Sequence, residues 1–361
     1  MRDGGCVLRY YTIIIYTLMI HRFTLLWLLG LLLTLPARLR ADGYTPDILR
    51  PDYARLTIAL PADGDAVPPV CTLVRHAPPA HARAALLYVH GYNDYFFQSA
   101  LGDTATRRGY AFYAIDLRDY GRSIRPGRDP FYTDDLRDYH ADIDSALAVI
   151  RREGYGRVVL MGHSTGGLIA ADYVRRHGKR QGIVALALNS PFLDWNFGWA
   201  MKRIAIPAVG FLGRLWPRWK VQGEGGDNYA RTLLAGQQGE WTYDTLWKKP
   251  HGWPKRAGWI GAVTRAQRRV RRGGITCPVL VLSSDSSTVD GARWDERYLR
   301  SDIVLSVSDI QRRGARLGCH VERAVVPGGM HDLLLSRRPA RDQAYALFFD
   351  FFDRVTAPGV P

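Results

Sequence analysis

The sequence has few cysteines for its length. Four occur among 361 residues, at positions 6, 71, 277 and 319, too few for a fold held together by a disulfide framework. The chain has no CxxC pair and no Cys/His cluster, which argues against a structural zinc site. Because 47% of the residues are hydrophobic, a disordered chain is excluded as well. The length fits one large α/β domain with an insertion, or two ordinary domains.

Acidic residues are also scarce relative to basic ones, and the net charge is +15. The excess lies in two segments. Residues 1–41 hold five arginines against one aspartate, and residues 192–276 hold fifteen Lys/Arg against five Asp/Glu. The remainder is close to neutral. A nucleic-acid-binding protein needs a basic groove on its main body, so this distribution argues against nucleic acid as a partner.

The longest apolar runs lie near the N-terminus, at residues 10–20 and 23–35, with His21 and Arg22 between them. The second run is too short to cross a bilayer alone, which takes about 20 residues. It has the length of a signal-peptide core and is followed by Pro36 and by small residues at Ala37 and Ala41. We expect residues 1–41 to be a signal peptide, starting at Met1 or Met19, or an uncleaved membrane anchor. Either way, the folded part is expected outside the cytoplasm, in the periplasm or extracellular space, or anchored at the membrane.

Downstream, the hydrophobic pattern predicts an α/β fold. Residues 53–60 and 69–76 form an expected hairpin. Short apolar runs bounded by glycine or polar residues are typical of strands buried on both faces of a parallel sheet. These runs cover residues 84–89, 110–115, 157–161, 183–188, 278–282 and 321–326. Helical patterns alternate with them at residues 98–108, 134–152, 164–177, 308–317 and 341–354. The alternation favours a mostly parallel, doubly wound sheet.

Residues 192–276, here called the insert, interrupt this alternation. They hold eight of the ten tryptophans: Trp195, Trp199, Trp216, Trp219, Trp241, Trp247, Trp253 and Trp259. We expect a Trp-rich basic lid between two core segments, residues 42–191 and 277–361. Tryptophans beside arginine and lysine suit an anionic membrane surface. The alternative is that the tryptophans pack the core of the lid itself.

The strand at residues 157–161 leads into Gly162-His163-Ser164-Thr165-Gly166, and a helical pattern follows at once. This is the G-x-S-x-G nucleophile elbow in its expected strand-turn-helix context. The tight turn leaves little room for side chains beside the serine and raises its Oγ above the sheet. It also directs the positive helix end and the Thr165 N–H toward a developing oxyanion. We therefore expect Ser164 to be a nucleophile.

With this elbow, the chain resembles the α/β-hydrolase superfamily, in particular its monoacylglycerol lipase, lysophospholipase and serine aminopeptidase S33-type branch. The resemblance also rests on residues 90–92 (HGY), 116–123 (DLRDYGRS), 190–192 (SPF) and 329–331 (GMH). It implies an α/β-hydrolase fold with a lid, and backbone N–H groups of Tyr92 and Thr165 as oxyanion donors. In this family the stretch at 116–123 has a structural role.

The chain order Ser-Asp-His of this fold places the base at His331, after the last predicted strand. The acid has two candidates. Asp302 is separated from His331 by one helix and one strand, the family's spacing, which makes residues 286–301 a loop insertion. Asp285 lies directly beyond the strand at 278–282 and fits the simpler rule of an acid at a strand tip. We favour Asp302 and keep Asp285 open.

The predicted function is hydrolysis of carboxylic esters, with lipid esters such as monoacylglycerols or lysophospholipids as substrates, through an acyl-enzyme on Ser164. Proline-type aminopeptidase or thioesterase chemistry on the same triad is the alternative, and a non-catalytic binding protein on this fold is the rival of another class. A serine in place of an aspartate nucleophile disfavours dehalogenase and epoxide-hydrolase chemistry. Triad chemistry requires no metal or organic cofactor.

Cys277 and Cys319 precede two strands expected to be neighbours, which leaves a disulfide open.

Overall fold

The computed structural model describes residues 43–223 and 225–359. The chain divides into two compact units, Met1–Thr45 and Pro46–Pro361, and the short strand β1 (Thr45–Pro46) spans their junction. The predicted signal peptide or anchor at residues 1–41 lies outside the described residues. Within the described part, no helix has the length and apolar character needed to cross a membrane.

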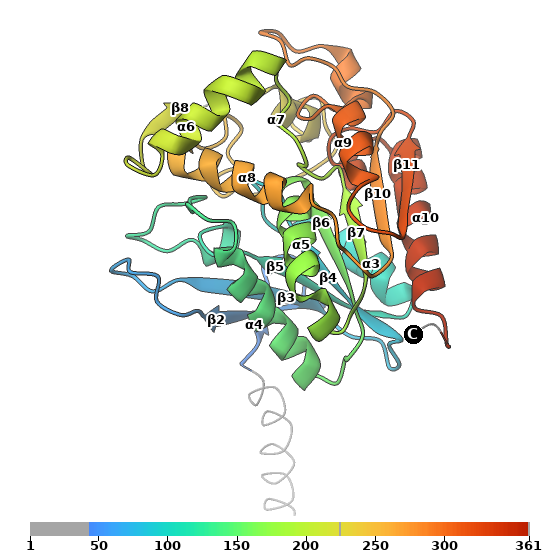
Figure 1. The fold of residues 1–361 in the computed structure, drawn as a ribbon. Coiled ribbons are helices and arrows are strands. Elements are labelled where there is room, and N and C mark those ends of the chain that lie inside the picture. The colour runs from blue at the N-terminus through green and yellow to red at the C-terminus, as the bar shows by residue number, and fades with distance from the viewer. Residues whose placement is uncertain (1–42, 224, 360–361) are drawn as a thin grey trace, which may run out of the picture. The chain divides into compact units, whose positions relative to one another are not determined.

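The second unit is built on a mixed, mostly parallel sheet with the order β2-β3-β5-β4-β6-β7-β10-β11 (Figure 1). Strand β3 pairs antiparallel with both β2 and β5, and the remaining neighbours are parallel. The bounds are β2 (Tyr53–Ala59), β3 (Val70–His76), β4 (Ala84–Val89), β5 (Tyr110–Asp116), β6 (Val158–His163), β7 (Ile183–Asn189), β10 (Val279–Ser284) and β11 (Val321–Val326). The predicted hairpin and doubly wound sheet are confirmed.

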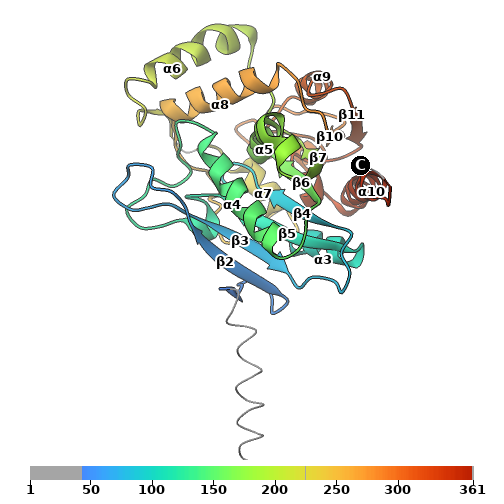
Figure 2. The same cartoon turned by 60° about the horizontal axis from the view of Figure 1, so that its bottom comes forward.

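Helices cover both faces of this sheet (Figures 1 and 2). They are α3 (Ser99–Arg107), α4 (Asp138–Arg152), α5 (Ser164–His177), α9 (Val307–Gly314) and α10 (Arg338–Val355). Short 3-10 turns are η1 (Gly121–Ser123), η2 (Gly178–Arg180), η4 (Glu296–Arg300) and η5 (Leu333–Leu335). Because side chains alternate along a strand, Leu280 and Leu282 face one layer while Val281 faces the other. Leu280 and Leu282 belong to the core cluster that includes α10, whereas Val281 lies against Gly314 of α9.

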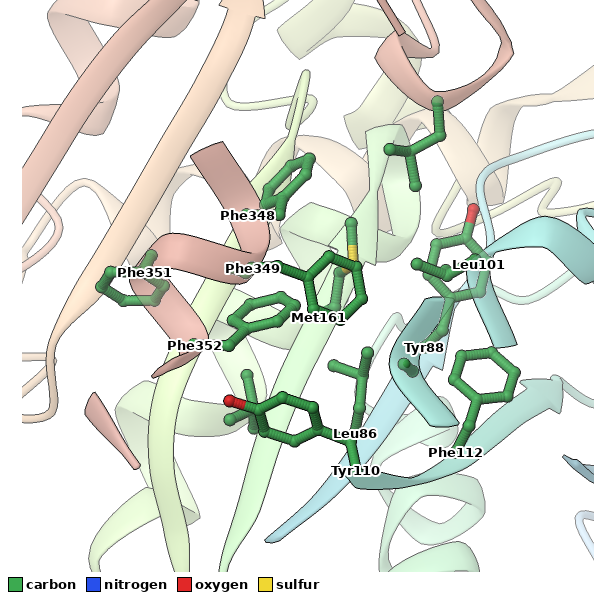
Figure 3. Close-up of a cluster of buried hydrophobic side chains, with 14 of the residues drawn as sticks. Leu86, Tyr88, Leu101, Tyr110, Phe112, Met161, Phe348, Phe349, Phe351 and Phe352 are labelled. Carbon is green, nitrogen blue, oxygen red and sulfur yellow. The ribbon is translucent and has the colours of Figure 1, made fainter. Parts of the chain in front are cut away.

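A large core cluster lies between the sheet, α3 and α10 (Figure 3). The end of α10 contributes Phe348, Phe349 and Phe352, all at most 1% exposed. They pack with Leu86 of β4 and Met161 of β6. Fully burying an aliphatic or aromatic side chain stabilises a fold by about 1.5–3 kcal/mol. This core therefore fixes β4 and β6, the two neighbouring strands that lead into the predicted oxyanion loop and nucleophile elbow.

The insert forms its own elements over the carboxyl ends of the parallel strands (Figure 1). It contains a π-helical turn η3 (Met201–Ala205), α6 (Ile206–Leu212), β8 (Lys220–Gln222), α7 (Asn228–Leu233), β9 (Lys255–Arg256) and α8 (Ala257–Val270). Strands β8 and β9 pair with each other in a separate sheet. Helix α6 packs on α8, and α8 packs on α5 of the core. A Cβ at Gly210 would lie 3.2 Å from the Cα of Gly261, so glycines allow the close crossing of α6 and α8.

The tryptophans of the insert differ in exposure. Trp259 is 4% exposed, whereas Trp199 and Trp216 are 71% and 61% exposed. Trp219 is also exposed, and the other four are half-buried. Trp195 packs on Trp259 within the insert, but Trp247 and Trp253 pack on Tyr95 and Phe131 of the core. The covered tryptophans therefore join the insert to the core as well as packing within it.

The structure differs from the sequence prediction at strand β11 and at the start of helix α4. Strand β11 is not buried on both faces, because it is the edge strand of the sheet, and Val325 is 44% exposed. Helix α4 begins at Asp138 instead of residue 134. There, Thr133 and Asp135 accept hydrogen bonds from the amides of Asp135 and Arg137, and such local bonds compete with a helix. Cys277 and Cys319, which precede neighbouring strands, are both free thiols.

Candidate active site

Ser164 lies at a sharp turn between β6 and α5, with a backbone φ of +51°. This left-handed conformation is strained for a non-glycine residue. A Cβ at Gly162 would lie 2.6 Å from the carbonyl oxygen of Gly166, and one at Gly166 would lie 2.1 Å from that of His90. Both positions therefore require glycine. The strand, the turn and the helix have the arrangement that the G-x-S-x-G pattern predicts.

The structure brings Ser164, His331 and Asp302 together in one chain of hydrogen bonds. His331 Nε2 lies 2.9 Å from Ser164 Oγ, and His331 Nδ1 lies 2.9 Å from Asp302 Oδ2. The three residues are 8%, 3% and 0% exposed. The carboxylate can hold the imidazole with its proton on Nδ1, which leaves Nε2 free to accept the serine proton.

Asp302 reaches this position although it lies 17 residues beyond Asp285 in the chain. Residues 286–301 leave the tip of β10 and return to it, because Asp302 N donates to Ser286 O at 2.9 Å and Thr288 N donates to Asp302 O at 3.0 Å. Asp302 Oδ1 accepts hydrogen bonds from Val304 N and Leu305 N at 2.8 and 2.7 Å. Asp285 is exposed and accepts from Gly328 N at 3.1 Å. The geometry favours Asp302 over Asp285 as the partner of the histidine.

The predicted oxyanion loop lies beside the serine. Strand β4 pairs with β6, with Val89 opposite Gly162, so the residues that follow each strand also lie close. A Cβ at Gly91 would be 3.2 Å from the Cβ of Ser164, which places the Gly91–Tyr92 peptide against the nucleophile. Thr165 begins the first turn of α5, where N–H groups have no helical partner. The backbone of both predicted donors is thus next to Ser164.

Other motif residues have structural contacts. His90 Nε2 accepts a hydrogen bond from Leu117 N at 3.1 Å, and burial lowers the pKa of its imidazole. Asp116 accepts from Phe96 N and Arg122 N at 2.8 and 3.0 Å. Arg122 Nη1 also binds Asp116, at 2.8 Å. These bonds fix the turns after β4 and β5, in agreement with the structural role that the family resemblance implies for residues 116–123.

A buried polar cluster beside the triad was not predicted from the sequence. Lys248 Nζ, from the insert, donates to Asp94 Oδ1 at 2.7 Å, and both residues are at least nine-tenths buried. His163 lies between Asp94 and Asp332, with one ligand atom of each of these three residues within 4.8 Å of the others. The ring centroids of His163 and His331 are 4.9 Å apart. Asp332 directly follows His331 and Asp94 lies two residues after Tyr92, but no sequence signal distinguishes Lys248 among the basic residues of the insert.

Within this cluster Lys248 offsets the charge of Asp94, while Asp332 is held by hydrogen bonds from neutral amides. Burial alone would raise the pKa of Asp94, but the charge of Lys248 and the nearby histidines holds it below its ordinary value. Burial lowers the pKa of His163 and outweighs the opposing effect of Asp332. Asp332 accepts hydrogen bonds from Asn189 Nδ2 at 2.7 Å and Gln98 Nε2 at 3.3 Å. Although Asp94, His163 and Asp332 have donor atoms suited to a metal, a lysine and two amides already satisfy the carboxylates.

Comparison with known proteins gives the same family. Residues 80–337 match the family Hydrolase_4, described as serine aminopeptidase, S33. Among solved structures, a soluble variant of monoglyceride lipase from Saccharomyces cerevisiae is 15% identical with a TM-score of 0.61, covering 82% of this chain and 95% of that chain. A carboxyl esterase from Bacillus coagulans is 13% identical with a TM-score of 0.59, covering 84% of this chain and 99% of that chain. These likenesses concern the fold.

Curated relatives match over shorter stretches. Epoxide hydrolase 3 from Xenopus tropicalis is 34% identical over 94 residues, which is 26% of this chain and 24% of that protein. The first relatives found are thus matched over only about a quarter of their own length. The family match, by contrast, covers most of the chain and both parts of the core. With its α/β-hydrolase fold and residues 80–337 matched, the chain belongs to the serine aminopeptidase S33 family of α/β-hydrolases.

Proposed function

We propose that this protein hydrolyses carboxylic esters, with lipid-derived esters as its substrates, through an acyl-enzyme on Ser164. The observation that carries the proposal is the buried chain of hydrogen bonds from Ser164 to His331 and on to Asp302. A serine hydroxyl is a weak nucleophile unless a base takes its proton. The 2.9 Å contact with His331 Nε2 provides that base.

In the proposed reaction, Ser164 Oγ attacks the ester carbonyl carbon while His331 Nε2 takes the serine proton. The carbonyl oxygen becomes an oxyanion, which accepts hydrogen bonds from the N–H groups of Tyr92 and Thr165. Collapse of this intermediate breaks the ester C–O bond, and His331 gives its proton to the departing alcohol. Water then attacks the acyl-enzyme with His331 again as base, which releases the acid and restores Ser164.

The surface of the insert supports a lipid substrate. Within residues 197–220, eight large hydrophobic side chains are exposed: Phe197, Trp199, Met201, Ile204, Phe211, Leu215, Trp216 and Trp219. An apolar groove of about 610 Å³ lies among residues 212 and 215–219. Arg214, Arg218 and Lys220 are exposed in the same segment. Tryptophans beside cations favour the boundary between water and an anionic bilayer, so we propose that residues 197–220 dock on such a membrane.

Aminopeptidase chemistry is the second candidate, because the family takes its name from it. A peptide with a free N-terminus brings an ammonium group, which an unpaired carboxylate in the site would bind. The buried carboxylates nearest the triad already have partners, since Asp94 binds Lys248 and Asp332 accepts from Asn189 and Gln98. This arrangement favours an uncharged ester over an N-terminal peptide.

The reaction is tested with p-nitrophenyl esters from acetyl to palmitoyl, and with proline p-nitroanilide and an acyl-CoA thioester beside them. We expect ester hydrolysis that Ser164→Ala abolishes and that Ser308→Ala, at an exposed serine, leaves unchanged. Preference for longer acyl chains supports a lipid substrate. Turnover of only the anilide or the thioester would refute the ester proposal in favour of that alternative.

Membrane docking is tested by sedimentation with phosphatidylglycerol or phosphatidylcholine vesicles. We expect binding to the anionic vesicles that weakens as salt screens the cations. Leu215→Ser and Trp216→Ser should reduce it, whereas Val289→Ser, at a position 87% exposed outside the insert, should not. Equal binding to both lipids, or equal loss in the Val289→Ser control, would contradict docking through residues 197–220.

A further inference from the structure

The loop that follows Tyr92 is held by the insert through three consecutive side chains. Asn93 Nδ2 donates to Lys249 O at 2.9 Å, and Asn93 Oδ1 accepts from Lys249 N at 3.1 Å. Tyr95 Oη accepts from Asp244 N at 2.7 Å. Asn93 thus bonds both the N–H and the C=O of one residue of the insert, Lys249, which fixes the Asn93 side chain in a single orientation.

Asp94, between Asn93 and Tyr95, makes the strongest of the three contacts between this loop and the insert. Asp94 pairs with Lys248 Nζ at 2.7 Å, and their side chains are 3% and 8% exposed. The Lys248 ammonium also lies between 5.6 and 6.0 Å from the ring centroids of Phe97, Tyr229 and Tyr243. Removing one partner of such a buried pair leaves the other charge uncompensated, which is strongly unfavourable. The insert is therefore bound to this loop by an ion pair as well as by hydrogen bonds.

This contact lies directly next to the proposed oxyanion donor. Tyr92 is bonded to Asn93 on one side, and on the other to Gly91, which packs against Ser164. Asn93 has a φ of +52°, and in this left-handed conformation its side chain bonds Lys249. The Tyr92 peptide is thus fixed on one side by the nucleophile elbow and on the other by residues 244–249.

We propose that residues 244–249 of the insert are a positioning element for the oxyanion hole, acting through Asn93 and Asp94 on the backbone N–H of Tyr92. This inference rests on the proposed function, because it concerns the oxyanion of that reaction. The insert then has two roles. It covers the site, where Tyr229 packs edge-on against His331 with ring centroids 5.8 Å apart, and it completes the oxyanion hole when it is seated. Seating of the insert and catalytic competence are coupled through one loop.

A positioning role of residues 244–249 affects binding of the transition state, whereas simple anchoring of the insert does not. A donor held in the wrong place weakens binding of a tetrahedral oxyanion but leaves ground-state binding of the ester almost unchanged. A misplacement of about 1 Å can cost on the order of 100-fold in rate. Anchoring alone would change stability or substrate affinity and would leave the binding of a transition-state analogue unaffected relative to the substrate.

The test uses Asn93→Gly in the full chain. Glycine accepts the left-handed backbone, and the substitution removes both side-chain hydrogen bonds to Lys249. We measure kcat and KM for p-nitrophenyl butyrate and the Ki of an alkyl trifluoromethyl ketone, which forms a tetrahedral oxyanion on the serine. We expect kcat to fall about 10- to 100-fold, KM to change less than about threefold, and Ki to rise in parallel with the loss of kcat/KM. The matched control is Glu240→Ala, which removes two ion pairs between the insert and the core, with Arg337 and Arg341, and should leave all three constants unchanged.

A second pair of variants tests the ion pair. Lys248→Arg keeps the charge and should retain more kcat than Lys248→Met, whose Asp94 has lost its partner. Unchanged kcat and Ki in Asn93→Gly, with wild-type turnover intact, would overturn this inference and leave the proposed function standing. A fall in kcat without a matching rise in Ki would overturn it too. Absence of turnover in the wild type would instead refute the proposed function.

Discussion

Replacing Asp302 by asparagine tests which acid supports His331, because the change preserves size and shape. Asp302 Oδ1 accepts hydrogen bonds from Val304 N and Leu305 N, and an asparagine carbonyl can accept these bonds in its place. The amide NH2 then faces His331 Nδ1, where the carboxylate oxygen lies 2.9 Å away in the wild type. Since NH2 is only a donor, Nδ1 must accept and the imidazole proton moves to Nε2. His331 can then no longer take the proton of Ser164.

The expected loss follows from this change of tautomer. A Ser-His-Asp triad with its acid replaced by asparagine loses about 10⁴ in kcat, which corresponds to about 5.5 kcal/mol in the activation free energy. Asp302→Asn should therefore lose about 10⁴-fold in kcat with little change in KM. Asp285→Asn removes only the charge of an exposed acceptor for Gly328 N, and we expect its kcat to change less than about twofold.

The assay is p-nitrophenyl butyrate hydrolysis at pH 7.5, with circular dichroism and thermal melting to show that each variant is folded. Retention of more than about a tenth of wild-type kcat in Asp302→Asn, despite native folding, would refute the assignment of the acid. An equal loss in Asp285→Asn would refute it as well, because that residue does not contact His331.

Three further predictions concern stability, measured by urea or thermal unfolding. Gly166→Ala should lower the free energy of unfolding by at least about 3 kcal/mol, because the new Cβ would lie 2.1 Å from His90 O. Gly156→Ala, with open space around the new Cβ, should not lower it. Equal effects of the two substitutions would contradict the packing argument. Arg122→Met should cost about 3–5 kcal/mol by leaving buried carboxylates unpaired, and a cost under about 1 kcal/mol would count against that. Burial lowers the pKa of His140 in the folded protein to about 4. The unfolded chain therefore binds more protons than the folded protein between pH 6.5 and 4, and the free energy of unfolding must fall as the pH falls through this range. The wild type should lose about 2 kcal/mol more than His140→Phe between pH 7 and pH 5; parallel pH curves for the two proteins would exclude His140 as the cause.

The sequence predicted most of the fold because its signals are local. A buried parallel strand is recorded in a run of apolar residues, and the bounds of β4 and α5 agree residue by residue with the predicted ranges. The start of α10 was missed by three residues, although Pro339 in its first turn is a helix-start signal. The exposure of β11 was missed because position at a sheet edge depends on strand order, which no property of residues 321–326 reveals.

Local sequence signals also identified part of the candidate site, and features set by the path of the chain were again harder to predict. Ser164 and His331 follow strands at places that the chain order of the fold specifies, so the sequence alone singled them out. Asp302 was harder, because residues 286–301 leave β10 and return to it through backbone hydrogen bonds with Ser286 and Thr288. Asp302 therefore fits both expectations for the acid. It has the family's spacing to His331, and it lies at the tip of β10.

The Asp94–Lys248 pair could not have been predicted in the same way. It joins residues 154 positions apart, and Lys248 is one of fifteen basic residues in the insert. Lys248 is the one of these fifteen that is buried, and the path of the insert over the loop after β4 brings it to a buried carboxylate. Long-range ion pairs of this kind leave no periodic pattern in a sequence.

The proposed reaction requires an activated nucleophile at Ser164, and a fluorophosphonate probe reports on that activation. Only a serine whose proton is removed by a neighbouring base reacts rapidly with such a probe. We expect one covalent adduct per chain, located by mass spectrometry on the peptide that contains Ser164, and no adduct in Ser164→Ala or after unfolding. A folded wild-type protein that fails to react, or that reacts equally well as Ser164→Ala, would refute nucleophilic catalysis by Ser164 and favour a non-catalytic binding protein on this fold.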